Sequence, residues 1–236
     1  LTQGIFVGAD GRFRQDQFEQ AFRHAARVAP IERTLREARH AAREAGFKGA
    51  MFPWQSASSG REETQTLHLN PESGHWLPDA SHLQRHINAA IAHNVWAYWQ
   101  VTRDMVFMRF WGAELMLEIA RFWSSIATYN HSLDRYEIKG VMGPDEYHEA
   151  YPDADEPGLD NNAYTNLMAV WCILRAFDVL ETLPGIRREE LLEKLDLGGD
   201  ELDRWGDLTR KMRLCFHGAG IISQFEGFGD REEFDW

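Results

Sequence analysis

The chain has 236 residues, which suits one large domain or two small ones, and its composition, 44% hydrophobic and 26% charged, is ordinary for a globular protein. Its formal net charge of −12, from 37 acidic and 25 basic side chains, argues against a nucleic-acid partner, because phosphate binding needs clustered Lys and Arg. No apolar run approaches membrane-spanning length and the first residues show no signal pattern, so we expect a cytoplasmic protein without a membrane segment.

The cysteine content points to reduced thiols rather than to a disulfide or a metal site. Cys172 and Cys215 are the only cysteines, and both lie in sequence that we predict to be apolar and helical. No Cys/His spacing resembles a zinc site. We therefore expect two free buried thiols and no bound metal.

The first third of the chain is predicted to hold two helices followed by a long irregular segment. Residues 1–14 are expected to be loop, and residues 15–28 helix. A second helix should begin at Pro30, whose missing N–H costs nothing in a first turn, and end at Gly46 with a left-handed cap. Residues 49–81 show no clear helical period, and irregular segments of that length inside compact domains are usually functional.

The middle of the chain is predicted to be two long helices. Ser81 and Gln84 form a capping box that should begin the first of them. Thr102 can cap the second. Positions 107–129 carry an apolar residue at every third or fourth place, which predicts one long buried face ending near Asn130.

The C-terminal part is also predicted to be helical. Asp160 should cap a helix with an aromatic stripe, which the Pro-Gly pair at 184–185 should end. Two charged amphipathic helices are expected at about 187–195 and 200–213, followed by a loop at 218–229. With hardly any strand signal, the chain is predicted to be all-α, and a toroid or an α-solenoid would both suit it.

The segment 140–149 is the strongest candidate for a catalytic loop. Gly143 and Pro144 fix a turn there, and two acids, Asp145 and Glu146, follow it. A carboxyl group beside a second acid and near apolar helices can have a raised pKa and act as a general acid. The alternative is a surface turn whose acids serve only solvation and capping. Paired carboxylates favour glycosidic or phosphoryl chemistry over acyl transfer.

The irregular segment before the first long helix offers side chains that suit sugar binding. Trp54 and Trp76 could stack on a sugar ring, and Arg61, Glu62 and Glu63 could hydrogen-bond its hydroxyl groups. A lone Trp in a loop more often fills a gap in the core. Several aromatic and charged residues in one segment favour binding.

Three segments of the chain resemble glycoside hydrolase family 65, a group of inverting phosphorylases and hydrolases acting on α-glucosyl disaccharides such as maltose, trehalose and kojibiose. They are residues 49–57 with 60–63, residues 141–148, and residues 160–166. Their order and spacing agree with the family. The resemblance implies an (α/α)₆ barrel, of which residues 1–236 would be an incomplete part belonging to a single catalytic domain.

The resemblance also implies roles for individual residues. Glu146 would be the general acid that protonates the glycosidic oxygen. Asn161 matches the motif after the acid, where it either contacts substrate or supports the loop through buried hydrogen bonds. The residues carried over as substrate-binding are Trp54, Gln55, Glu62, Glu63, Asp145 and Asn161.

The family's phosphate-binding loops would follow Trp236, so we expect this chain to be part of a catalytic domain. The favoured function is phosphorolysis of a disaccharide with inversion, giving β-glucose 1-phosphate, with inorganic phosphate as co-substrate and no cofactor. The alternatives are an inverting hydrolase, in which a second carboxylate activates water at roughly 6.5–9.5 Å from the acid, and a sugar-binding module without turnover. A homodimer is among the assemblies that the resemblance allows.

Overall fold

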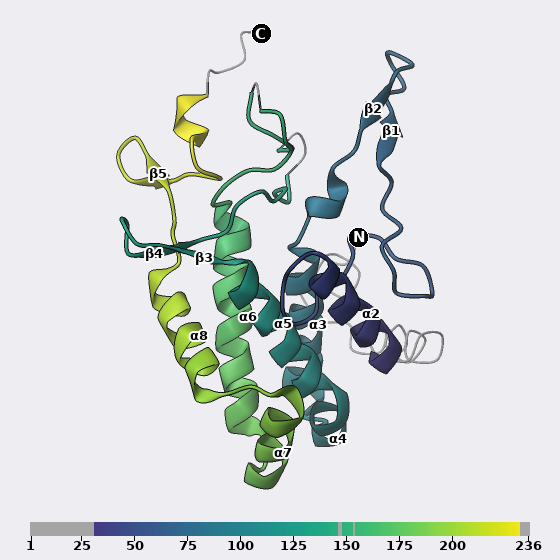
Figure 1. Cartoon of the computed structure of the whole chain (residues 1–236), viewed down its shortest axis with the longest axis vertical. Coiled ribbons are helices and arrows are strands. Elements are labelled where there is room, and N and C mark those ends of the chain that lie inside the picture. Colours follow the sequence, from purple (N-terminus) through teal and green to yellow (C-terminus); the bar gives the residue numbers. More distant parts are fainter. Residues whose placement is uncertain (1–30, 146–147, 153, 232–236) are drawn as a thin grey trace.

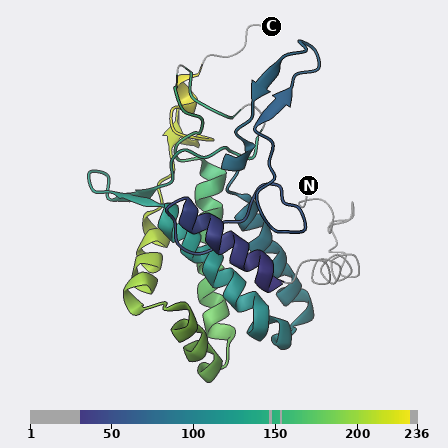
Figure 2. The same cartoon turned by 45° about the vertical axis from the view of Figure 1, so that its right-hand side comes forward.

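The computed structural model describes residues 31–145, 148–152 and 154–231. Helices lie side by side in its lower part, and the long loops and a projecting hairpin gather at the other end (Figure 1). A view turned by 45° shows the same division between a helical body and a loop-bearing end (Figure 2).

The first described helix, α2, spans Ile31–Glu44. It ends as predicted, because Gly46 has a φ of +80° and the N–H of Phe47 donates to the carbonyl of Ala42 at 2.7 Å. The predictions for residues 1–30, including the earlier helix and the start at Pro30, lie outside the described residues.

Helix α3 spans Ile87–Thr102 and begins later than the capping box predicted. Ser81 instead opens a 3₁₀ turn, Ser81–Leu83, and Gln84 follows it. The prediction is wrong because the carboxylate of Asp79 accepts the Ser81 N–H at 2.8 Å and closes a separate turn before the helix.

The connection after α3 also differs from the prediction. Thr102 is the last residue of α3, and its hydroxyl donates to the carbonyl of Tyr98 at 2.8 Å. The cap of the short helix α4, Met105–Phe107, is Asp104, whose side chain accepts the Phe107 N–H at 3.0 Å. A π-helical turn, Met108–Gly112, then leads into the next helix.

Helix α5, Ala113–Ile126, lies at the centre of the fold, since all of its residues except Arg121 and Ser125 are buried. It packs against α3, α6 and α8. Gly49, in the turn after α2, approaches the backbone of α5 so closely that a Cβ atom there would overlap the carbonyl oxygen of Glu118. This contact fixes the start of the irregular segment on the core helix.

The strands are short hairpins that the sequence did not reveal. After α5 the chain forms β3, Thr128–Asn130, paired antiparallel with β4, Arg135–Glu137, where a continued helix was predicted. Strands of two or three residues are too short to show an alternating pattern. The other pairs are β1, Leu67–Leu69, with β2, Trp76–Pro78, and β5, Phe216–His217, with β6, Ile221–Ile222.

The last helices are α6, Ala163–Thr182, α7, Gly185–Leu195, and α8, Gly199–Lys211, close to the predicted ranges. The cap of α6 is Asn162 rather than Asp160, because the Asn162 side chain accepts the N–H of the third helical residue at 3.0 Å.

Helix α6 is long and apolar enough to cross a membrane by length and composition, contrary to the prediction that no such run exists. Half of that stretch is buried within the fold, and α6 makes its most extensive helix contact with α5. It also carries Asn166, Arg175 and Asp178. We therefore interpret α6 as a core helix, which meets the same criterion.

Both cysteines are free thiols. Cys172 is buried in α6, whereas Cys215 lies in the extended segment after α8 and not in a helix as predicted. Burial raises the pKa of both thiols, which keeps them protonated at neutral pH.

Candidate active site

The candidate site lies at the loop-bearing end, above the first turns of α3 and α6 (Figure 1). Two segments are central to it. We call residues 49–64 the Pro-Trp loop and residues 138–161, which connect β4 to α6, the acid loop. The segment after α8, residues 212–228, packs beside the acid loop.

The acid loop is closed at its base by backbone hydrogen bonds. The N–H of Val141 donates to the carbonyl of Leu159 at 3.1 Å, and the N–H of Leu159 donates back to Val141 at 2.8 Å. Gly158 has a φ of +111°, and a Cβ atom there would lie 2.6 Å from the carbonyl carbon of Gly140. The base therefore requires glycine where its two sides touch.

The predicted catalytic turn belongs to this loop. Glu146, the predicted general acid, lies outside the described residues. Asp145 is exposed, and its carboxylate is 3.9 Å from Nδ1 of His148. Gly143 packs on Asn162, since a Cβ atom at Gly143 would lie 2.6 Å from the Asn162 Nδ2 atom. Gly143, at the start of this turn, is thus fixed against the cap of α6.

Three aromatic rings form a row beside the acid loop. The centroid of Trp54 lies 5.4 Å from that of His86, and His86 lies 6.0 Å from Tyr164. Trp54 and Tyr164 are half-buried. A partly exposed indole over a packed aromatic base is a suitable stacking surface for a sugar ring. The N–H of Met142 donates to the carbonyl of Leu83 at 3.1 Å, which joins the acid loop to the turn that precedes His86.

His86 is the most perturbed imidazole among the described residues. Its side chain is buried, and burial lowers its pKa to about 4. The ring is therefore neutral at physiological pH and forms an uncharged aromatic contact with Trp54. The sequence analysis did not select His86 or Tyr164, because nothing in the sequence separates His86 from the nine other histidines.

The structure brings Gln55, Glu62 and Glu63 together in one turn of the Pro-Trp loop. The N–H of Glu63 donates to the Gln55 carbonyl at 2.9 Å, and the Gln55 N–H donates to the hydroxyl of Thr64 at 3.1 Å. That hydroxyl also hydrogen-bonds the Glu62 carboxylate. All three predicted side chains are exposed and lie in the loop that carries Trp54, and the Glu62 carboxylate also accepts hydrogen bonds from Thr64.

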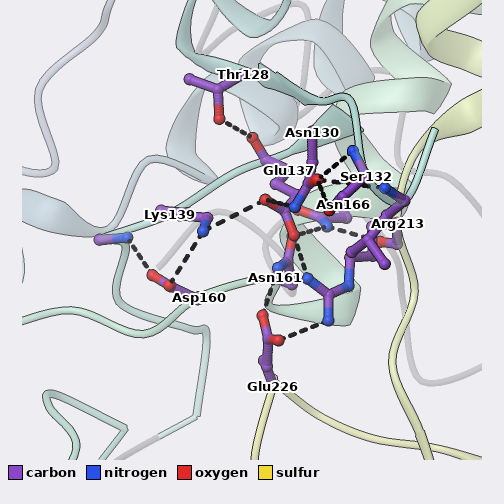
Figure 3. Close-up of polar contacts among 12 residues, drawn as sticks. Thr128, Asn130, Ser132, Glu137, Lys139, Asp160, Asn161, Asn166, Arg213 and Glu226 are labelled. Carbon is purple, nitrogen blue, oxygen red and sulfur yellow. Dashed lines mark hydrogen bonds and ion pairs between the residues drawn. The ribbon is translucent and has the colours of Figure 1, made fainter. Parts of the chain in front are cut away.

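Asn161 is fully buried, with a φ of +52°, and its side chain faces other protein groups (Figure 3). Its amide donates to Oε2 of Glu226 at 2.8 Å and accepts from Asn166 at 3.4 Å. Of the two roles considered for Asn161, these contacts favour support of the loop.

Glu226 belongs to a partly buried polar group that we call the Arg213 cluster, in which side chains from β4, the acid loop and the segment after α8 meet (Figure 3). Arg213 forms ion pairs with Glu137 and with Glu226, the latter at 2.5 Å. Burial alone would raise the pKa of Glu137, but hydrogen bonds from Arg213 and Asn130 hold it below its ordinary value. The sequence analysis did not identify this cluster, whose members are Glu137, Lys139, Asp160, Asn161, Arg213 and Glu226.

No group of three or more His, Cys, Asp or Glu side chains that could hold a metal ion occurs within residues 31–145, 148–152 and 154–231. The described site consists of carboxylates, amides and aromatic rings, which suits binding of a neutral, hydroxyl-rich ligand.

A family model described as the glycosyl hydrolase family 65 central catalytic domain matches residues 25–236. The chain belongs to glycoside hydrolase family 65. The three motifs at 49–63, 141–148 and 160–166 all fall inside the matched range, and the fold gathers them at one end of the helices (Figure 2).

Relatives within family 65 carry several names. The chain is 52% identical over 204 residues to an uncharacterized glycosyl hydrolase of Mycobacterium tuberculosis, covering 86% of this chain and 15% of that protein. It is 41% identical to a kojibiose phosphorylase of Halothermothrix orenii and 40% identical to a trehalose 6-phosphate phosphorylase of Lactococcus lactis. Those matches cover 86% of this chain and 26% and 25% of the two phosphorylases. The chain thus spans about a quarter or less of these relatives.

A solved structure of a putative kojibiose phosphorylase from the human microbiome shares the fold. It superposes with a TM-score of 0.71 at 24% identity, over 92% of this chain and 28% of that one. The predicted all-α class is confirmed, and the helices are part of the (α/α)₆ toroid of family 65.

Proposed function

We propose that this chain is part of the catalytic domain of an inverting phosphorylase that cleaves an α-glucosidic bond of a disaccharide with inorganic phosphate and releases β-glucose 1-phosphate. The observation that carries the proposal is the meeting of Trp54, the acid loop and the Asn162 cap at one end of a family 65 fold. Relatives named as phosphorylases support phosphate as the nucleophile.

Each residue has a proposed role in this reaction. Glu146 donates the proton to the glycosidic oxygen, while phosphate approaches the anomeric carbon from the opposite face. Trp54 stacks on the sugar, and Asp145 orients the turn that carries the acid. The exposed side chains of Gln55, Glu62 and Glu63 bind hydroxyl groups of the substrate, and Asn161 supports the loop. The groups that hold phosphate are assigned to the part of the relatives that this chain does not span.

We further propose that residues 1–236 belong to one barrel domain whose remaining helices cover α3 and α6. Both helices are mostly apolar, and their apolar residues are not confined to one side, which is typical of helices with more than one buried face. Val101 on α3 and Leu167 and Leu174 on α6 are nevertheless exposed here. Further helices of the toroid would remove these side chains from water.

The proposal requires a disaccharide and phosphate as partners, and neither a cofactor nor a metal. A cytoplasmic location and a homodimer are included in it, and the net charge of −12 disfavours a nucleic-acid partner.

The test is to incubate the full-length protein with kojibiose, trehalose, maltose and trehalose 6-phosphate in phosphate buffer, and to follow the product by phosphorus and proton NMR. We expect β-glucose 1-phosphate from one of them. Free glucose formed equally without phosphate would make the protein a hydrolase. Saturable sugar binding with no turnover of any substrate would favour the sugar-binding module.

A further inference from the structure

We propose that Arg213 is a positioning residue, which holds both ends of the acid loop in register so that Glu146 meets the glycosidic oxygen. This inference rests on the proposed function for its catalytic part. Its structural part, the fixing of the loop by one guanidinium group, can be measured without any turnover.

Arg213 holds the entry of the loop through Glu137. The Nη1 atom of Arg213 pairs with Oε1 of Glu137, the last residue of β4 and the one before the acid loop begins. A backbone hydrogen bond joins the same two segments, because the N–H of Arg213 donates to the carbonyl of Tyr136 at 2.9 Å. The Glu137 side chain is only 3% exposed, so Arg213 is its main compensation for lost hydration.

Arg213 holds the exit of the loop through Glu226. Its Nη2 atom pairs with Oε1 of Glu226 at 2.5 Å, and Oε2 of Glu226 accepts the amide of Asn161 at 2.8 Å. The N–H of Glu226 also donates to the carbonyl of Asp160 at 2.9 Å. One guanidinium group thus reaches residues 137 and 161, at the two sides of the loop, through two carboxylates (Figure 3).

Arg213 can hold the two sides of the loop in a fixed position, because it belongs to a different segment of the chain. It follows α8, and its carbonyl accepts the amide of Asn166, a buried residue in the first turns of α6, at 2.8 Å. The planar guanidinium presents two N–H groups to two acceptors at once, which a lysine ammonium cannot reproduce in the same geometry.

Removal of the guanidinium would leave Glu137 and Glu226 as two anions without their shared cation. Lys139 lies 3.3 Å from Glu137 and 4.0 Å from Asp160, but it is half-exposed and neither of these pairs includes Glu226, so it compensates Glu137 alone of the two anions. We expect the two sides of the loop to separate. A general acid displaced by about 1 Å loses up to about 100-fold in rate.

The catalytic test compares two leaving groups in the full-length protein. Arg213→Met should lower kcat for the disaccharide by about 10- to 100-fold while KM changes by less than about threefold. Turnover of α-glucosyl fluoride, whose fluoride departs without a proton, should fall by less than about threefold. Arg213→Lys should recover part of the loss.

The matched control is Arg121→Met, since Arg121 is a similarly buried arginine that pairs with Glu201 outside the loop. Arg121→Met should leave unchanged the ratio of the turnover rate for the disaccharide to that for α-glucosyl fluoride.

The structural test is amide hydrogen exchange on the same variants. In Arg213→Met the N–H groups of Val141 and Leu159 should exchange about tenfold faster than in the wild type, while those of α5 keep their protection. Arg121→Met should leave the two loop amides as they are. Unchanged exchange at Val141 and Leu159, or an equal loss for disaccharide and fluoride, would overturn the assignment. If the wild type cleaves no α-glucoside, the proposed function fails, and the exchange result still decides whether Arg213 fixes the loop.

Discussion

At the scale of single residues, the neutral imidazole of His86 packs against Trp54, the proposed sugar-stacking residue. His86 is 7% exposed and lies between Trp54 and Tyr164. Because burial penalises the charged form, the pKa falls to about 4 and the ring stays neutral until strongly acidic pH. The stacking surface is therefore expected to stay intact across the physiological range.

His86 should make stability depend on pH below neutrality. Its pKa is about 4 in the folded chain against 6.5 for an ordinary imidazole, so the unfolded chain binds the extra proton first as pH falls. The stabilisation is full above pH 6.5 and is lost progressively toward pH 4. Between pH 7 and pH 4.5 the loss should be about 2.5 kcal/mol. Urea unfolding of the wild type and of His86→Phe at both pH values measures it. An identical pH dependence in the two proteins would contradict the assignment.

Glu146 should be essential for cleavage and dispensable for folding. Glu146→Gln removes the transferable proton with little change in shape, so kcat for the disaccharide should fall by about 10³-fold. Its neighbour supplies the matched control, because Asp145 is an exposed acid in the same turn, and Asp145→Asn should cost far less. Initial rates give the activities, and far-ultraviolet circular dichroism with thermal unfolding checks the fold. Turnover of Glu146→Gln near the wild-type rate would rule out the proposed acid.

At the scale of elements, the acid loop is a long connection, but its base is held in place by specific backbone and packing contacts. The paired backbone groups of Val141 and Leu159 close it, and Gly143 is packed on the cap of α6. The side chains of Tyr151 and Phe225 pack together over it, with ring centroids 6.1 Å apart. Substitutions at the base should thus act on both stability and activity.

Gly158→Ala tests the base of the loop directly. The φ of +111° and the contact with Gly140 make a side chain costly there, and we expect a loss of about 2–3 kcal/mol in unfolding free energy together with reduced turnover. Gly74→Ala is the control, because Gly74 also has a positive φ, +70°, but open space around it. It should cost about 1 kcal/mol and leave turnover unchanged. Equal costs at the two positions would argue against a tightly packed base.

The sequence predicted the helices and the motifs better than their ends and contacts. The apolar period located α5 and α6, and the left-handed cap at Gly46 was confirmed. The capping box at Ser81 failed because Asp79 competes for the same backbone N–H, a choice that only three-dimensional geometry decides. Arg213 was missed because its partner Glu137 is far away along the chain, and no local pattern records such a pair.

At the scale of the whole molecule, α3 and α6 carry apolar side chains that are exposed in the described part of the chain, namely Val101, Leu167 and Leu174. Exposed leucines are normal on proteins when they are scattered, but Leu167 and Leu174 recur along one side of the mostly apolar helix α6. In the proposed larger barrel, these exposed side chains would be part of the hydrophobic core.

Leu174→Glu should therefore behave as a core substitution in the full-length protein. If further helices cover α6, the buried charge should cost about 3 kcal/mol or more in unfolding free energy. Leu133, in the turn between β3 and β4, is 46% exposed against 41% for Leu174, and Leu133→Glu should stay within about 0.5 kcal/mol. Chemical denaturation of both variants gives the comparison. Similar small effects at the two sites would mean that α6 remains solvent-facing.

The closed base of the acid loop also has a consequence for how this kind of enzyme can diversify. Because the pairing of Val141 with Leu159 holds the two sides together, the chain between them can change length with little effect on the helices below. Doubling a flexible loop costs only about 0.6 kcal/mol in closure entropy. Insertions and deletions between residues 154 and 157, which are exposed, should thus be tolerated far better than changes at 140–143 or 158–162. Exchange of that short stretch between homologues should therefore leave the helical scaffold unchanged.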